Sequence, residues 1–129
     1  MRVLVAEDDK DMSAWVCAVL KSAGHETKTV FDTMSVQMAA LRDPQPEVVI
    51  LDLGMPAGNG MGALARLQAG AKTRGIPVLV LSATTDVSAP LRALDAGAAG
   101  FLAKPTTPEA LLAAVGALRT PARATAARR

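Results

Sequence analysis

The sequence predicts an α/β domain, a (βα)5 arrangement in which five parallel β-strands form a doubly wound sheet with helices on both faces. The first observation behind this prediction is that short apolar runs alternate strictly with longer segments of helical periodicity. The second is that several of these runs show no polar alternation, which is typical of strands buried on both faces. The third is the length of 129 residues, 50% of them hydrophobic, which suits one domain with an aliphatic core.

Each predicted strand is a short run of β-prone residues bounded by charged or turn-forming residues. The most apolar of them runs directly into Asp52 and is then interrupted by Gly54 and Pro56. The fourth begins with an Ile-Pro pair, a place where proline removes no ladder hydrogen bond. The five predicted strands are residues 3–6, 27–30, 48–51, 76–81 and 100–103.

Each predicted helix carries apolar residues three or four positions apart, and this stripe is expected to face the sheet. Gly24 and Gly97 are expected to end the first and fourth helices, and Asp32 or Thr33 to cap the second. The fifth begins at Thr107, followed by a proline and an acid. The stripes expected to face inward are Met12, Trp15, Val16, Val19 and Leu20; Met34, Met38 and Leu41; Met61, Leu64 and Leu67; Val87, Leu91 and Leu94; and Leu111, Leu112, Val115 and Leu118.

Composition and charge exclude several classes of protein. No apolar run approaches the ~20 residues of a membrane helix, and a single Cys fits a reducing, cytoplasmic compartment. Residues 119–129 carry four of the 14 basic side chains, so the remaining 10 are outnumbered by 12 acidic ones and nucleic-acid binding is not expected of this domain. We expect residues 1–119 to form the domain and the Ala/Arg-rich residues 120–129 to be a disordered tail or linker remnant.

Polar side chains stand where four of the predicted strands end. The carboxyl ends of parallel strands share one edge of a sheet, which is where open α/β sheets bind ligands. Crowded carboxylates imply a bound cation, and oxygen ligands fit Mg²⁺ or Mn²⁺ better than zinc. Asp52 can then attack phosphorus and form an aspartyl phosphate, while Asp9 is expected to cap the first helix instead. The strand-end residues are Glu7, Asp8 and Asp9, then Asp52, Ser82 and Lys104.

Four motifs surround these residues, and they extend in order over the chain from Met1 to about Leu118. The motifs are Leu4-Val5-Ala6-Glu7-Asp8-Asp9, Val49-Ile50-Leu51-Asp52-Leu53-Gly54-Met55-Pro56, Val78-Leu79-Val80-Leu81-Ser82-Ala83 and Ala96-Gly97-Ala98-Ala99-Gly100-Phe101-Leu102-Ala103-Lys104-Pro105. With them the chain resembles the receiver domain of two-component response regulators. This resemblance implies a flavodoxin-like, CheY-like fold with the strand order 2-1-3-4-5.

The resemblance also assigns a role to each strand-end residue. Asp52 corresponds to the phosphoacceptor and Lys104 to the lysine that binds a phosphoryl oxygen. The Mg²⁺ ligands would be Asp8, Asp52 and the backbone carbonyl of Gly54, with Glu7 acting through a water molecule. The Lys104–Pro105 peptide bond is expected to be cis.

The resemblance further implies a switch. Ser82 would move to donate a hydrogen bond to the phosphoryl group, and Phe101 would rotate into the space beneath it, which changes the surface of the fourth helix, fifth strand and fifth helix. Gly54 and Thr84 correspond to positions that flank the path of the hydrolytic water. Because both are small, we expect a short-lived phosphorylated state.

The implied phosphodonor is a sensor histidine kinase or a histidine phosphotransfer protein, and the implied target is a downstream effector or output domain. Such a protein catalyses its own phosphorylation and dephosphorylation and is not an enzyme with a separate substrate. Residues 96–101 lack the Asp-Asp-Tyr run typical of dimerising receivers, which predicts a monomer or weak dimer. The alternative is a receiver-like interaction scaffold that works without phosphorylation.

Overall fold

One five-stranded parallel sheet organises the chain, with the strand order β2-β1-β3-β4-β5, and this confirms the predicted fold class and topology. The computed structural model describes residues 1–55 and 60–118. The predicted tail, residues 120–129, lies outside the described residues, as does part of the turn-rich segment after Asp52. The elements are β1 (Arg2–Ala6), α1 (Lys10–Ser22), β2 (Glu26–Val30), α2 (Met34–Leu41), β3 (Val48–Asp52), α3 (Gly60–Ala69), β4 (Val78–Ser82), α4 (Ala89–Asp95), β5 (Gly100–Ala103) and α5 (Pro108–Ala117).

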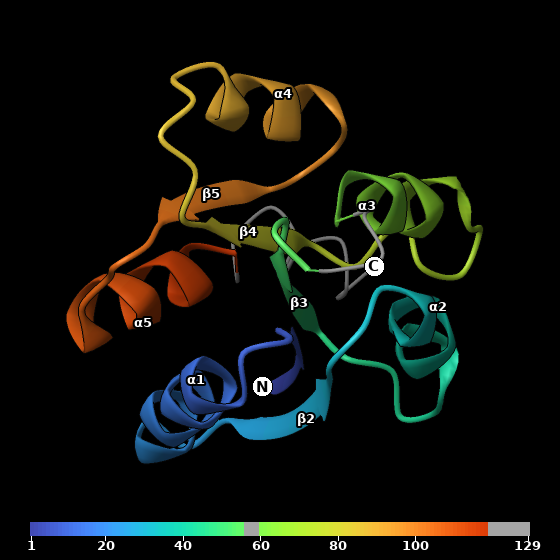
Figure 1. The fold of residues 1–129 in the computed structure, drawn as a ribbon. Helices are drawn as coiled ribbons and strands as arrows, with labels where there is room; N and C mark the ends of the chain where they lie inside the picture. Colours follow the sequence, from blue (N-terminus) through green and yellow to red (C-terminus); the bar gives the residue numbers. More distant parts are fainter. Residues whose placement is uncertain (56–59, 119–129) are drawn as a thin grey trace.

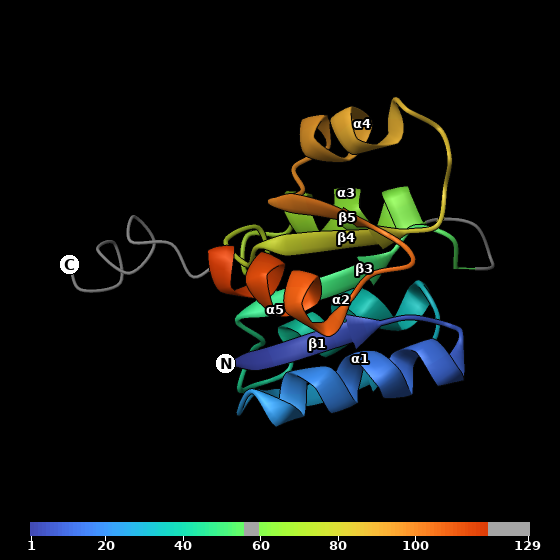
Figure 2. The ribbon, with the colours of Figure 1, turned by 90° about the vertical axis from the view of Figure 1, so that its left-hand side faces the viewer.

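The helices form a layer on each face of the sheet. Helices α1 and α5 cover one face, and α2, α3 and α4 cover the other (Figures 1 and 2). Successive strand residues alternate between the two layers, so Leu4 and Ala6 pack with the α2–α4 side while Val3 and Val5 pack with α1 and α5. The strands β3 and β4 are buried along their whole length, as their unbroken apolar runs predicted.

The ends of the helices follow the predicted signals. The Asp9 side chain caps α1 by accepting hydrogen bonds from the backbone N–H groups of Asp11 and Met12. Of the two candidates for the cap of α2, Asp32 makes the hydrogen bond, at 2.8 Å from the N–H of Ser35. Gly24 and Gly97 both adopt positive φ angles, +87° and +106°, directly after the ends of α1 and α4.

Two of the predicted inward stripes are wrong. In α2 the side chains of Met34, Met38 and Leu41 are exposed, and Val36 and Ala40 are buried instead. This helix carries two apolar stripes, and the stripe of smaller residues faces the sheet because small side chains let the helix pack closely.

Helix α4 repeats this pattern. Val87, Leu91 and Leu94 are exposed by 95%, 64% and 47%, whereas Ala89 and Ala93 are buried. The larger side chains therefore remain on the surface, where they form an apolar face that the sheet does not cover.

The strand register positions the functional edge. Ala6 lies beside Leu51, Asp52 beside Leu81, and Ser82 beside Ala103, so the carboxyl ends of four neighbouring strands are level. No helix in the described ranges has the length and apolar character needed to cross a lipid bilayer.

A close backbone contact holds the loop that follows Asp52. At Gly60, the first residue of α3, a Cβ atom would lie 2.4 Å from the Cα atom of Leu53. Only glycine lets the start of α3 approach that loop so closely.

Candidate functional site

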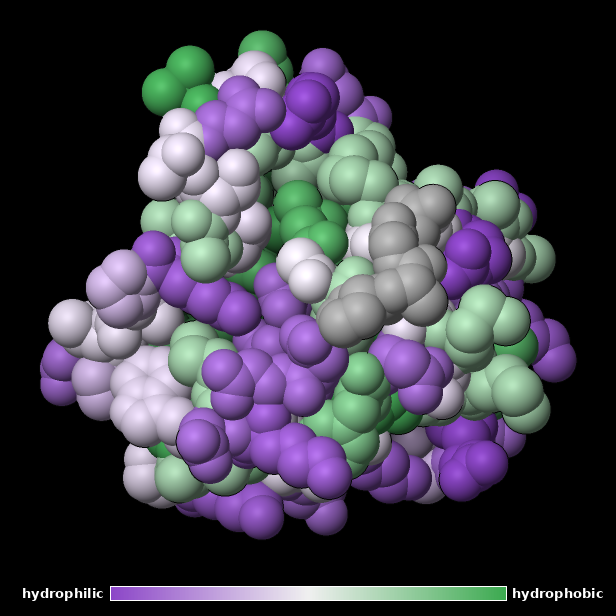
Figure 3. Space-filling view, in the orientation of Figure 1, coloured by the Kyte–Doolittle hydropathy of each residue, from purple (hydrophilic) through white to green (hydrophobic). Residues whose placement is uncertain are grey.

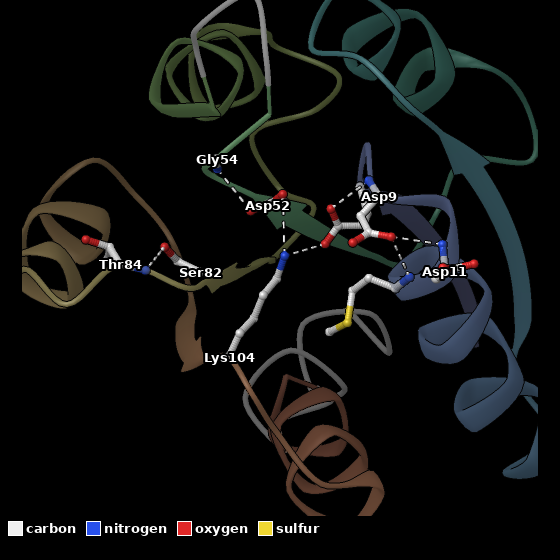
Figure 4. Close-up of polar contacts among 9 residues, drawn as sticks. Asp9, Asp11, Asp52, Gly54, Ser82, Thr84 and Lys104 are labelled. Carbon is white, nitrogen blue, oxygen red and sulfur yellow. Dashed lines mark hydrogen bonds and ion pairs between the residues drawn. The ribbon is translucent and has the colours of Figure 1, made fainter.

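The predicted site residues from β1, β3 and β5 converge at the carboxyl edge of the sheet. Glu7 directly follows β1, Asp52 is the last residue of β3, and Lys104 directly follows β5. Figure 4 shows Lys104 reaching across from β5 toward the carboxylate of Asp52. The central surface of Figure 3, over this edge, is correspondingly hydrophilic.

Three carboxylates form the acidic part of the site. One oxygen atom each from Glu7, Asp8 and Asp52 can be chosen so that all lie within 4.8 Å of one another. Glu7 is only 2% exposed and Asp52 only 6%, whereas Asp8 is half-buried. Buried carboxylates this close together are costly unless cations compensate them.

Lys104 supplies part of that compensation. Its Nζ atom lies 2.6 Å from Glu7 Oε1 and 3.5 Å from Asp52 Oδ2. Burial opposes the charged form of Lys104, but the two carboxylates outweigh burial and raise its pKa, so the side chain stays an ammonium ion. Sequence reasoning missed the pairing with Glu7, although the surplus of acids over lysines at this edge was a signal for it.

Glu7 is the most perturbed carboxyl group of the site. Burial raises its pKa from 4.5 to about 7, because the attraction of Lys104 and the N–H of Asp9 only partly offset the loss of hydration. The neighbouring Asp52 carboxylate adds to the upward shift. Glu7 therefore changes charge near neutral pH when no metal is present.

The carboxylate of Asp52 has two distinct oxygen atoms. Oδ1 accepts a hydrogen bond of 2.9 Å from the N–H of Gly54, and Oδ2 faces Lys104. A Cβ atom at position 54 would lie 3.5 Å from Oδ1, which is ordinary contact distance. Glycine at this position thus leaves open a space next to the carboxylate that any other residue would occupy.

Ser82 and its neighbours form the part of the site nearest α4. Ser82 is 4% exposed, and its hydroxyl oxygen accepts a 3.2 Å hydrogen bond from the N–H of Thr84 (Figure 4). Phe101 is half-buried on β5, beside Val80, and packs against the core on the α2–α4 side. Ser82 and Phe101 thus lie on adjacent strands, and Ser82 reaches the functional edge.

Two peptide bonds that precede proline are cis. One is Lys104–Pro105, the isomer that the resemblance implies, and the other is Asp43–Pro44, which sequence reasoning did not single out. Beside the first lies a cavity of about 310 Å³, lined by Met12, Trp15, Ala83, Lys104, Pro105 and Thr106.

This arrangement fits a hard divalent cation. The three clustered ligand groups are all oxygen donors, and a cation placed among them would relieve their mutual repulsion. The donor set contains neither thiolate nor imidazole, which favours Mg²⁺ or Mn²⁺ over zinc. The same charge that holds a cation can position a phosphoryl group against Asp52.

Comparison with known proteins agrees with this geometry. The family model for the response regulator receiver domain matches residues 3–116. Over 117 residues the chain is 33% identical to the phosphate regulon transcriptional regulatory protein PhoB of Klebsiella pneumoniae, covering 91% of this chain and 51% of that protein. Over 116 residues it is 34% identical to the DNA-binding response regulator MtrA of Mycolicibacterium smegmatis, covering 90% and 49%.

A solved structure extends the comparison to the fold. The chemotaxis response regulator CheY4 of Vibrio cholerae superposes with a TM-score of 0.81 at 26% identity, over 91% of this chain and 97% of that one. The chain spans about half the length of the PhoB and MtrA relatives. It covers nearly the whole of the CheY4 chain.

Proposed function

The chain belongs to the response regulator receiver domain family of two-component systems, and we propose that it accepts a phosphoryl group on Asp52. The donor is a phosphohistidine of a sensor histidine kinase or of a histidine phosphotransfer protein. The observation that carries the proposal is the convergence of Glu7, Asp8, Asp52 and Lys104 at one edge of the sheet.

The chemistry is an in-line displacement at phosphorus. A carboxylate oxygen of Asp52 forms a bond to phosphorus while the bond from phosphorus to the imidazole nitrogen of the donor breaks, and the electron pair leaves with that nitrogen. Lys104 neutralises one oxygen of the transferred group, which lies within reach because its Nζ atom is 3.5 Å from Asp52 Oδ2.

We infer that Mg²⁺, or Mn²⁺, binds at Asp8, Asp52 and the carbonyl of Gly54, with Glu7 contributing through a water molecule. The ion supplies charge neutralisation for the carboxylates and the incoming phosphoryl oxygens. The fit depends on the three oxygen atoms within 4.8 Å of one another and on their burial.

The output of the domain is a change in the α4–β5–α5 surface. Ser82 turns its hydroxyl group toward the phosphoryl oxygens, and Phe101 rotates inward behind it. The exposed side chains of Leu91 and Leu94 on α4, and of Val87 in the loop just before it, support this assignment, because they form an apolar surface for an effector or output domain. Figure 3 shows strongly hydrophobic atoms at the outer side of this helix.

The remaining parts of the proposal follow from this role. The domain acts in the cytoplasm, as a monomer or weak dimer, and turns over no separate substrate beyond its own phosphorylation and hydrolysis. Nucleic-acid binding is not expected of this domain itself. A scaffold that works without phosphorylation is not favoured, because it would have no use for a buried acidic cluster beside Lys104.

Intact mass after incubation with acetyl phosphate tests the proposal. The wild type should gain the mass of one phosphoryl group when Mg²⁺ is present and lose this gain when the metal is chelated. No gain under either condition would contradict it, and the Asp52→Asn variant provides the matched control because it keeps the shape of the side chain.

A further inference from the structure

A series of hydrogen bonds leads from Ser82 to the middle of α4. The N–H of Thr84 donates to Ser82 Oγ at 3.2 Å, and the N–H of Asp86 donates to Thr84 Oγ1 at 3.1 Å. The guanidinium group of Arg92 then donates to Asp86 Oδ2 at 2.9 Å. In the first two steps a backbone N–H donates to the side-chain oxygen two residues before it, and only the last step joins two side chains. The switch hydroxyl is thus connected to the helix through the backbone of residues 84–86 and the Asp86–Arg92 pair.

Asp86 is the centre of this series. Its other carboxylate oxygen, Oδ1, accepts hydrogen bonds from both the backbone N–H and the hydroxyl group of Ser88, at 2.9 and 2.8 Å. Its carbonyl oxygen accepts a further bond from the N–H of Ala89, the first residue of α4. The two hydrogen bonds from Ser88 are the main cause of a lowered pKa of Asp86, and Arg92 adds to it, so the carboxylate remains ionised.

Helix α4 itself has little apolar packing to hold it. Of the seven residues described in this helix, only Ala89 and Ala93 are buried. Leu91 and Leu94, which could bury much more area, are exposed by 64% and 47%. Since alanine side chains contribute little burial energy, the polar contacts at the start of α4 account for a larger share of what holds the helix in place.

We propose that Asp86 and Arg92 are positioning residues that couple the Ser82 switch to α4. The inference rests on the proposed function, because it takes phosphorylation of Asp52 as the event that moves Ser82. When the Ser82 hydroxyl turns toward the phosphoryl group, the N–H of Thr84 loses its acceptor. The Asp86–Arg92 ion pair makes α4 move with the loop, rather than letting the loop rearrange alone.

Hydrogen exchange of α4 in the presence and absence of beryllofluoride and Mg²⁺ tests the coupling. Beryllofluoride mimics a phosphoryl group on aspartate, and fluorine NMR reports independently whether the site is loaded. The Arg92→Gln variant removes the ion pair, Arg92→Lys retains a charge there, and Arg74→Gln changes an exposed arginine of the loop before β4 as a matched control.

In the wild type, beryllofluoride should change the exchange of the segment 83–99. We expect this change to fall roughly two- to five-fold in Arg92→Gln, because an exposed ion pair is a modest interaction. It should be partly restored in Arg92→Lys and unchanged in Arg74→Gln, while all four proteins load equally. An Asp86→Ala variant should reduce it further, since it also removes the bonds from Ser88.

Different failures have different meanings. If Arg92→Gln loads normally and its α4 exchange responds as in the wild type, the coupling role is overturned and the proposed function is untouched. If Arg92→Gln fails to load, Arg92 acts on the phosphoryl site itself and the coupling role is again overturned. If the wild type does not load, the proposed function fails and the inference fails with it.

Discussion

The pH dependence of stability in the metal-free protein provides a sharp test of the site. Glu7 is 2% exposed, and burial raises its pKa from 4.5 to about 7. A carboxyl group whose pKa is higher in the folded state than in the unfolded state binds more protons when folded, so stability falls as pH rises between these two values. The shift corresponds to about 3 kcal/mol lost between pH 4.5 and pH 7.

Urea unfolding in a chelating buffer at pH 5 and at pH 7.5 measures this loss. The wild type should be less stable at the higher pH, and Glu7→Gln should show a much smaller difference because it cannot ionise. Using the difference between the two proteins removes the contribution of other groups that titrate in this range. Equal pH dependence in the wild type and in Glu7→Gln would refute the reasoning about burial.

The same experiment with Mg²⁺ should counteract the loss of stability at the higher pH. A cation binds the deprotonated carboxylates, so the stabilisation by Mg²⁺ should be larger at pH 7.5 than at pH 5. Stabilisation that is independent of pH would show that the ion binds away from Glu7.

Three further predictions address the phosphoryl group and the packing. Lys104→Ala should still be phosphorylated by acetyl phosphate, but roughly 10- to 100-fold more slowly, because a charged hydrogen bond is lost. This variant should also lose the response of α4. An unchanged rate and response would count against the role of Lys104. Gly54→Asn places a side chain next to Asp52 and should lengthen the lifetime of the phosphorylated state, whereas a wild-type half-time of many hours would contradict the expected short lifetime. Gly60→Ala should destabilise the fold by about 1–3 kcal/mol, because its Cβ atom would lie 2.4 Å from a backbone carbon. Gly116→Ala in α5, where a Cβ atom would have nothing within 4 Å, should instead stabilise the fold by about 0.5–1 kcal/mol. Equal effects in thermal unfolding would contradict this packing.

The order of strands and helices was predictable because each strand can be recognised from the residues of a short segment of the sequence. The run that ends in Asp52 has no polar alternation, and a buried parallel strand is the structure that such a run favours. Because parallel strands end on the same side, the same pattern also predicted that Asp52 and Lys104 would meet at one edge. Their proximity therefore needed no knowledge of side-chain contacts.

Which face of a helix turns inward was harder to predict. Both α2 and α4 present two apolar stripes, and hydrophobicity alone favoured the larger side chains of Met38 and Leu91. The structure buries Ala40 and Ala93 instead, since close packing on the sheet favours small residues. That choice depends on the distance between layers, which a single helix sequence does not contain.

The contacts within the site could be predicted only in part. Glu7 and Lys104 are 97 positions apart, and their 2.6 Å contact depends on the side-chain conformations of both. The bonds from Ser82 toward Arg92 are local in sequence, but many loops contain such residues without forming them. The position of these residues at one edge of the sheet was therefore easier to predict than the contacts that they make there.

The most direct test of the central claim is to locate the phosphoryl group. Reduction of the acyl phosphate with borohydride, followed by peptide mass mapping, marks the carboxyl group that carried it. The account predicts one modified residue, Asp52, only when Mg²⁺ is present, and no modification in Asp52→Asn. Modification at another residue, or equal labelling of Asp52→Asn, would contradict it.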